Sequence, residues 1–146
     1  MVSRRGYSLM LLLALFTCPL QCISASTSDL VSRIISLNKL IVTPEKYLGT
    51  KVQTFGYFWS AGESPDGHAR GAICQTLDDI KYGVYANCIG VLADKKFLDQ
   101  FTEADGKMVQ VVGKFKDTDT LSFGDSVGSL VGVSRFNLLR LVHPQK

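Results

Sequence analysis

The sequence predicts a mainly β domain: a five-stranded barrel with one helix between the third and fourth strands and a helical hook before the first. Two stretches from different halves of the chain carry this prediction, residues 49–58 (GTKVQTFGYF) and 106–115 (GKMVQVVGKF). Each follows a polar turn, is rich in β-forming residues, and has a second glycine late in the strand. A glycine there weakens a flat strand but suits a bend, a bulge or a tight barrel corner. The pair therefore indicates a small, strongly curved sheet.

The N-terminal hook precedes the first of these strands. Residues 31–35 (VSRII) include three apolar, β-branched residues, which fits either a short strand or the start of a helix. Ser36 stands where it would cap a short, leucine-containing helical turn. Residues 43–45 (TPE) are typical of a helix start, with threonine as cap, proline at the first position and an acid at the positive end. Gly49 is then expected to end the segment.

The first strand is predicted from Val52 to Ser60. Alternation divides its side chains between two faces, Val52, Thr54, Gly56 and Phe58 on one and Gln53, Phe55, Tyr57 and Trp59 on the other. A loop rich in turn-forming residues follows at 60–70. Two short strands, 72–76 and 87–92, are expected on either side of a polar excursion at 77–85.

The second half of the chain supplies the helix and two more strands. Asp94 is expected to cap a helix whose apolar positions keep helical spacing: Phe97, Leu98, Phe101 and Ala104. Strands are predicted at 108–115 and 131–142, with a polar loop at 116–128 between them. This order of elements is that of an OB-fold, in which the first and fourth strands are neighbours. The alternatives are a β-sandwich, which usually needs about seven strands, and an open α+β sheet.

A family resemblance rests on residues 37–58, above all on the segment LNKLIVTPEKYLGTKVQ. This segment resembles the opening of small exported bacterial proteins with a tRNA-anticodon-binding-like OB domain. The segment VQVVGKF at 109–115 looks like the fourth strand of the same family. The family is largely of unknown function, so the resemblance implies a fold and a compartment and no catalytic residues.

The first 25 residues have the form of an export signal. Arg4 and Arg5 are followed by a mostly apolar run at 7–20 and by small residues at 24–26, as in a signal peptide. The run is interrupted by Pro19 and is short for a membrane span of about 20 residues, although an uncleaved anchor is the alternative. Many members of the family look like lipoproteins, but no small residue directly precedes either cysteine of this segment. The chain is therefore expected to be an exported protein, periplasmic or secreted, with no stable membrane span in its mature part.

Residues 26–146 are expected to form a single OB-fold-like domain, because about 120 residues bury one modest core. Residues 1–25 hold two of the 16 basic residues and none of the 13 acidic ones, so the remainder carries a net charge of +1. A broad nucleic-acid footprint usually shows as a strongly basic domain. An oligosaccharide, a peptide or a protein is therefore favoured over nucleic acid as the partner.

Cysteine usage agrees with export. Cys74 and Cys88 are the two cysteines outside the signal segment, and an even pair in an oxidising compartment predicts one disulfide. Two free thiols are the alternative. The only histidines, His68 and His143, are isolated from one another, so no metal and no other cofactor is expected.

Four residues are candidates for ligand binding: Tyr57 and Trp59, which share a strand face, and His68 and Arg70, which end the first long loop. OB-folds bind ligands on the barrel face and adjoining loops, often by stacking on aromatic rings. The alternatives are that Tyr57 and Trp59 pack against the hook or a neighbouring loop, and that His68 is merely exposed. No nucleophile–base pair is recognisable, so no catalytic residue is assigned and the protein is predicted not to be an enzyme. The sequence predicts a binding module, or alternatively an accessory or inhibitor protein that acts through protein–protein contact.

Overall fold

The computed structural model describes residues 32–117 and 126–140. The predicted signal peptide, most of the predicted loop at 116–128 and the end of the predicted last strand lie outside these residues. The strands are β1 (Arg33–Ile34), β2 (Lys51–Glu63), β3 (Ala69–Cys74), β4 (Cys88–Ala93), β5 (Met108–Lys116) and β6 (Ser129–Leu138). The helices are α1 (Leu37–Val42), α2 (Leu77–Tyr82) and α3 (Leu98–Glu103), with short 3₁₀ turns η2 (Pro44–Lys46), η3 (Tyr85–Asn87) and η4 (Lys95–Phe97).

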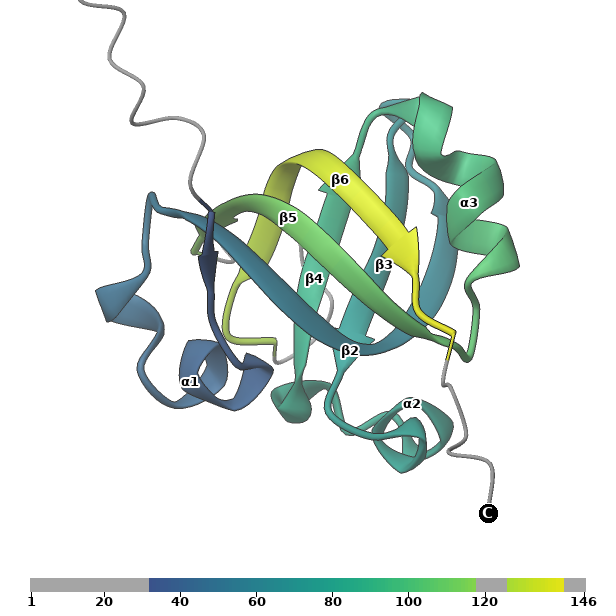
Figure 1. Ribbon diagram of the computed structural model, residues 1–146. Coiled ribbons are helices and arrows are strands. Elements are labelled where there is room, and N and C mark those ends of the chain that lie inside the picture. The colour runs from purple at the N-terminus through teal and green to yellow at the C-terminus, as the bar shows by residue number, and fades with distance from the viewer. Residues whose placement is uncertain (1–31, 118–125, 141–146) are drawn as a thin grey trace, which may run out of the picture.

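The strands close into a barrel. Their order is β1-β2-β3-β4-β6-β5, and β5 pairs again with β2 (Figure 1). β1 is a two-residue parallel addition to β2, so the barrel has five strands, with α3 between its third and fourth strands. This is the OB-fold order, and the predicted fold class is confirmed. The two similar strands, β2 and β5, are direct neighbours, as that fold requires.

The late glycine of β2 sits where two strands approach closely. A Cβ atom added at Gly56 would lie 2.6 Å from the carbonyl oxygen of Cys74 and against the side chain of Ile73. In β5, a Cβ at Gly113 would lie 3.1 Å from the carbonyl oxygen of Val131. The curvature predicted from these two glycines therefore has a steric basis, since a larger residue at Gly56 would push β3 away from β2.

The barrel interior is filled by one face of each strand. Burial along β2 follows the predicted alternation, with Val52, Thr54, Gly56 and Phe58 buried. The fully buried ring of Phe58 meets Phe101 of α3 and Phe136 of β6 edge-on, at centroid distances of 4.7 and 4.9 Å. Leu37 and Leu40 of α1 are also part of this core. Both the hook and α3 are thus held by apolar side chains inserted into the barrel core.

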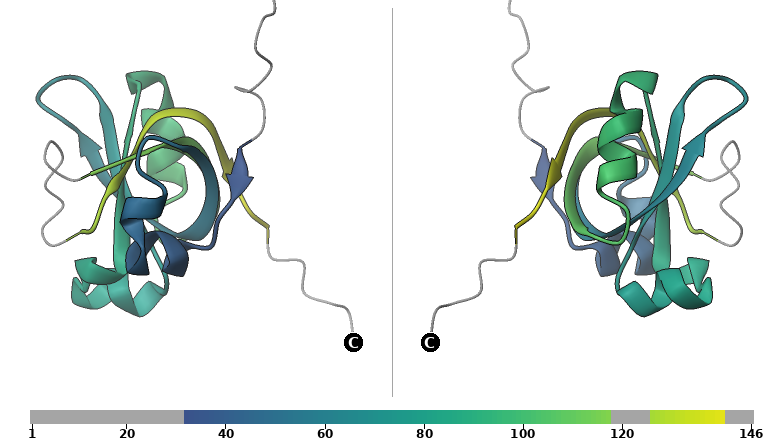
Figure 2. Two further views of the ribbon diagram at one scale, coloured as in Figure 1. Left: turned by 90° about the vertical axis from the view of Figure 1, so that its left-hand side faces the viewer. Right: turned by 90° about the vertical axis from the view of Figure 1, so that its right-hand side faces the viewer.

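The predicted loop at 60–70 is mostly strand. β2 continues to Glu63 and β3 begins at Ala69, so only 64–68 form the turn of a hairpin, which projects from the barrel in Figure 2. The register shifts between Ser60 and Gly62, and Gly62 has a φ of +76°. A bulge of this kind lets a strand bend and keep pairing, which explains why a turn-like composition continues as strand.

The polar excursion at 77–85 contains a helix that the sequence analysis missed. Thr76 and Asp79 form a capping box at the start of α2, and Gly83 ends the helix in the left-handed region, with a φ of +67°. The Asp79 carboxylate accepts hydrogen bonds from the Thr76 backbone N–H (2.8 Å) and hydroxyl (2.7 Å) and from Asn87 Nδ2 (2.8 Å). Burial raises the pKa of Asp79, but the hydrogen bonds from Asn87 and Thr76 outweigh it, so the pKa lies below the ordinary value.

We expect this cap to make stability depend on pH. Because the folded-state pKa lies below the unfolded value of about 3.9, ionised Asp79 stabilises the fold above about pH 4. That contribution is lost as the pH falls through the lowered pKa. Asp79→Asn should lower the free energy of unfolding by about 1–2 kcal/mol at pH 7 and by less at pH 3. Urea unfolding measures both values, with the exposed neighbour Asp78→Asn as control; an equal loss at the two pH values would contradict the expectation.

Candidate ligand-binding surface

The four predicted ligand-binding residues do not gather at one point. Tyr57 lies where β2 passes from one half of the barrel to the other, because it pairs with Cys74 of β3 and with Met108 of β5. Trp59, two residues further on, faces the β3–β4 side, opposite Ala72. The curvature of β2 thus separates two aromatic residues that share a strand face.

Trp59 packs onto a small cluster outside the barrel. Its ring is half-buried against Ala72 and the Cys74–Cys88 disulfide, with the Tyr85 ring centroid 5.8 Å away. The predicted disulfide is confirmed: Cys74 and Cys88 are register partners on β3 and β4, with Cα atoms 4.1 Å apart. Trp59 was expected either to bind a ligand or to pack against the hook or a neighbouring loop. Its contacts match packing against a neighbouring segment, that of residues 77–87.

His68 and Arg70 belong to the β2–β3 hairpin. His68 is exposed in the turn, where its backbone N–H donates to Ser64 Oγ at 3.0 Å. Arg70 lies on β3 and pairs with Gly62 and with Leu92 of β4. The structure therefore places both residues on the β3–β4 side of the barrel with Trp59.

Tyr57 lines an open hollow of about 480 Å³, here called the Tyr57 hollow. Its walls come from the start of α2, the start of β5 and the end of β6: Tyr57, Leu77, Gly106, Lys107, Met108, Leu138, Leu139 and Arg140. Most of these side chains are apolar, and Lys107 and Arg140 add two positive charges. The volume lies within the usual range of small-ligand sites, about 300–1,000 Å³. Leu77 is 47% exposed, so the hollow presents apolar surface to a ligand.

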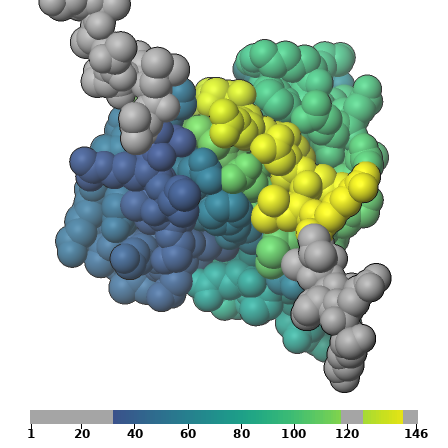
Figure 3. All heavy atoms as spheres, viewed as in Figure 1, coloured from purple at the N-terminus to yellow at the C-terminus, as the bar shows by residue number. Residues whose placement is uncertain are grey.

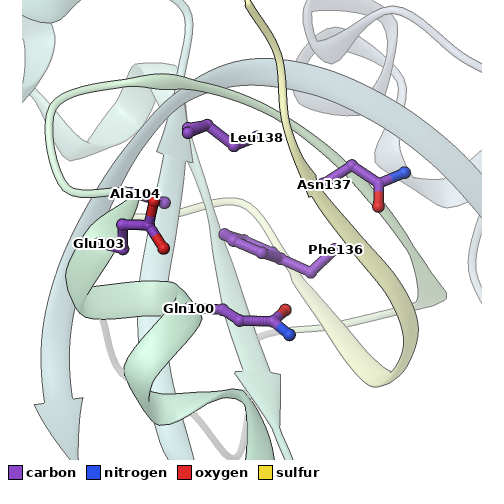
Figure 4. Close-up of a pocket in the computed structure, with 6 residues that line it drawn as sticks. All are labelled: Gln100, Glu103, Ala104, Phe136, Asn137 and Leu138. Carbon is purple, nitrogen blue, oxygen red and sulfur yellow. The ribbon is translucent and has the colours of Figure 1, made fainter.

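A second hollow, of about 390 Å³, lies between α3 and β6 (Figure 4). Phe136, which belongs to the barrel core, lies between Gln100 and Glu103 of α3 and Asn137 of β6, whose side chain points away from the helix. Leu138 lines this hollow and the Tyr57 hollow alike.

The opposite end of the same strands carries positive charge. Two hollows of about 240 and 360 Å³ share Lys51; one is also lined by Arg135 and the other by Lys114. Lys51 and Lys114 are direct register partners on β2 and β5. Sequence reasoning missed this surface because the two lysines lie 63 positions apart and meet only through the β2–β5 register.

Among the described residues, no three His, Cys, Asp or Glu side chains are grouped so that they would hold a metal ion. Across residues 32–117 and 126–140, no helix has both the length and the apolar character needed to cross a membrane.

The fold and the surface together define an OB-fold domain with open hollows on its outer surface. No protein-family model matches the sequence, and no curated protein matches it. The structure is similar to part of a protein described as an aspartyl-tRNA synthetase from Leishmania major Friedlin, with a TM-score of 0.52 and 13% sequence identity. The match covers 79% of this chain and 22% of that chain, so the present chain spans about a fifth of that protein. A likeness at this identity shows the fold alone.

Proposed function

We propose that the protein is an exported, non-enzymatic binding module of the small bacterial OB-fold type. Its ligand is held on the outer face of β2, in and beside the Tyr57 hollow. The observation that carries the proposal is this open, mainly apolar hollow of about 480 Å³ with an aromatic side chain and two cations on its walls. Small-ligand sites are typically apolar and carry a small number of convergent polar groups, which fix the orientation of the ligand. The Cys74–Cys88 disulfide supports export, because such bonds persist in oxidising compartments.

This proposal moves the binding site away from the hairpin. Trp59, His68 and Arg70 lie on the β3–β4 side, and Trp59 is engaged with the disulfide cluster. Of the four candidates, Tyr57 alone lines the hollow. We therefore propose Tyr57, with Leu77 and Met108, as the contact residues.

The test compares two exposed leucines. Leu77 lines the hollow and is 47% exposed, whereas Leu48 of the hook is 44% exposed and is not on its walls. Leu77→Ser and Leu48→Ser should therefore lower the free energy of unfolding by similarly small amounts. The purified protein is screened on arrays of oligosaccharides and short peptides. We expect Leu77→Ser and Tyr57→Ala to weaken the signals about tenfold and Leu48→Ser to leave them unchanged. Equal signals from all variants, or no signal from the wild-type protein, would overturn the proposal.

The second candidate is an accessory or inhibitor protein that acts through protein–protein contact. It is favoured by three exposed apolar side chains around α2: Leu77, Tyr82 and Val84, which are 47, 68 and 42% exposed. Exposed apolar residues that form a patch mark contact surfaces. Peptide-array signals that depend on Tyr82 and Val84, and that survive Tyr57→Ala, would favour this candidate over the first.

A further inference from the structure

Charge is unevenly distributed over the described part of the molecule. The segments 32–34, 51–60, 106–116 and 129–140 contain no acidic residue. The same segments carry seven exposed basic residues: Arg33, Lys51, Lys107, Lys114, Lys116, Arg135 and Arg140. All ten acidic residues of the described part lie outside these segments. Eight lie at the β2–β3 hairpin, on α2 and around α3, and the other two are Glu45 and Asp117, which directly follows β5. A net charge near zero therefore conceals a local excess of positive charge on these strands.

Five of these basic residues belong with the Tyr57 hollow to one face, here called the β2–β5–β6 face: Lys51, Lys114 and Arg135 at one end, and Lys107 and Arg140 at the hollow. The face is defined by the side chains that point away from the core on these strands. In register from one end to the other, it has a row with Lys51 and Lys114, a row with Gln53 and Arg135, a row with Phe55, Gln110 and Asn137, and a row with Tyr57 and Met108. In Figures 1 and 3 this face is turned toward the viewer, with β5 and β6 in front of β3 and β4.

Positive charges gather at the basic end of the face. Lys51 and Lys114 stand directly opposite each other on β2 and β5. Arg135 adds a third positive charge at the hollow it shares with Lys51, where Ser32 and Ser134 supply hydroxyl groups. An anionic group that lies among these side chains is attracted to each of them. The arrangement therefore points to a ligand that carries negative charge.

The middle and far rows of the face carry a different chemistry. Gln53, Gln110 and Asn137 present amide groups, and Asn137 Nδ2 donates to Gln110 Oε1 at 2.9 Å. Amides both donate and accept hydrogen bonds, which suits hydroxyl groups. Tyr57 then offers an aromatic ring beside the two cations of its hollow. From Lys51 to Tyr57 the face extends about 20 Å, so it accommodates an oligomer.

We propose that the β2–β5–β6 face binds an acidic oligosaccharide, a chain of sugar units that carry carboxylate or sulfate groups. This inference rests on the proposed function and names its ligand class. In this proposal the cations at both ends of the face bind the acidic groups. The amide groups of Gln53, Gln110 and Asn137 bind hydroxyl groups, and the Tyr57 ring contacts the apolar face of a sugar. A single-stranded nucleic acid stacks successive bases on a series of aromatic rings, whereas the walls of the Tyr57 hollow carry one such ring, that of Tyr57.

The experiment measures the affinity of the purified protein for a galacturonate hexamer by titration calorimetry, with the methyl-esterified hexamer as the uncharged probe. We expect the acid to bind at least about tenfold more tightly than the ester, with an affinity that falls as salt is added. The double variant Lys114→Gln, Arg135→Gln should lower the affinity for the acid about tenfold. Its matched control is Lys81→Gln, Lys96→Gln, which removes the same charge from α2 and η4 and should leave the affinity unchanged.

Several outcomes would overturn the inference. They are equal binding of acid and ester, equal weakening by the two double variants, and tighter binding of an oligothymidylate or of phosphatidylglycerol vesicles through Lys114 and Arg135. If the neutral hexamer binds, the acid does not, and Tyr57→Ala abolishes the binding, then the acidic ligand class is wrong but the proposed function stands. If binding of the acid depends on Lys114 and Arg135 but is unchanged by Tyr57→Ala, then the ligand class is supported and the Tyr57 hollow is not part of the site.

Discussion

Phe58→Ala is expected to lower the free energy of unfolding by about 3–5 kcal/mol, the range for truncating a buried phenylalanine. Phe58 is fully buried, and its ring meets two other aromatic rings, Phe101 and Phe136. These three residues come from β2, α3 and β6, so a cavity at Phe58 removes contacts that join the sheet to its helix. Denaturant unfolding followed by circular dichroism measures the change.

Phe97→Ala is the matched control for this substitution. Phe97 is only partly buried, and its ring centroid lies 6.3 Å from that of Phe101 at the margin of the core. We expect its truncation to cost clearly less than that of Phe58. Equal losses at the two positions would contradict the assignment of Phe58 to the centre of the core.

Removal of the disulfide is expected to have the second-largest effect. Cys74 and Cys88 are 14 residues apart in sequence, and closing a loop of that length contributes about 3 kcal/mol in the chain-entropy model. The double variant Cys74→Ala, Cys88→Ala should therefore unfold at a lower urea concentration by that margin. Trp59 fluorescence should report the change locally, because the indole packs against the disulfide cluster.

Treatment of the wild-type protein with a reducing agent separates the crosslink from the side chains. If the crosslink supplies the stability, reduced protein should approach the double variant in its free energy of unfolding. A double variant as stable as the oxidised protein would contradict the expectation.

The sequence was sufficient for the parts of the fold that follow from local pattern. Period-two alternation predicted which side chains of β2 enter the core, and helical spacing predicted that Phe101 of α3 and Ala104 at its C-terminal end are buried. The two glycine-containing strands predicted a curved sheet in which the first and fourth strands are neighbours. In each case the signal lies within one element and is set by its own geometry.

Two local features were missed for physical reasons. Helix α2 is only six residues long, too short for hydrophobic periodicity to reveal it. The available signal was the pair Thr76 and Asp79, three residues apart, followed by Gly83. The hairpin was expected to be a long loop because glycine and serine favour turns. The bulge between Ser60 and Gly62 keeps those residues in the strand.

The candidate site was less predictable than the fold because it depends on contacts between distant segments. Alternation placed Tyr57 and Trp59 on the same strand face, but the turn of β2 from β5 toward β3 sends them to different surfaces. Net charge was equally uninformative, because it is one number for the whole chain. The basic face becomes visible only when the register brings Lys114 opposite Lys51.

The most direct test of the proposed surface is an NMR titration of ¹⁵N-labelled protein with the galacturonate hexamer. The proposal predicts the largest amide shifts on the β2–β5–β6 face, at Gln53, Gln110 and Lys114. It predicts little change at Gly90 and Leu92 of β4 on the opposite side of the barrel. Shifts concentrated on β4 and the 64–68 turn, with the β2–β5–β6 face unchanged, would contradict it.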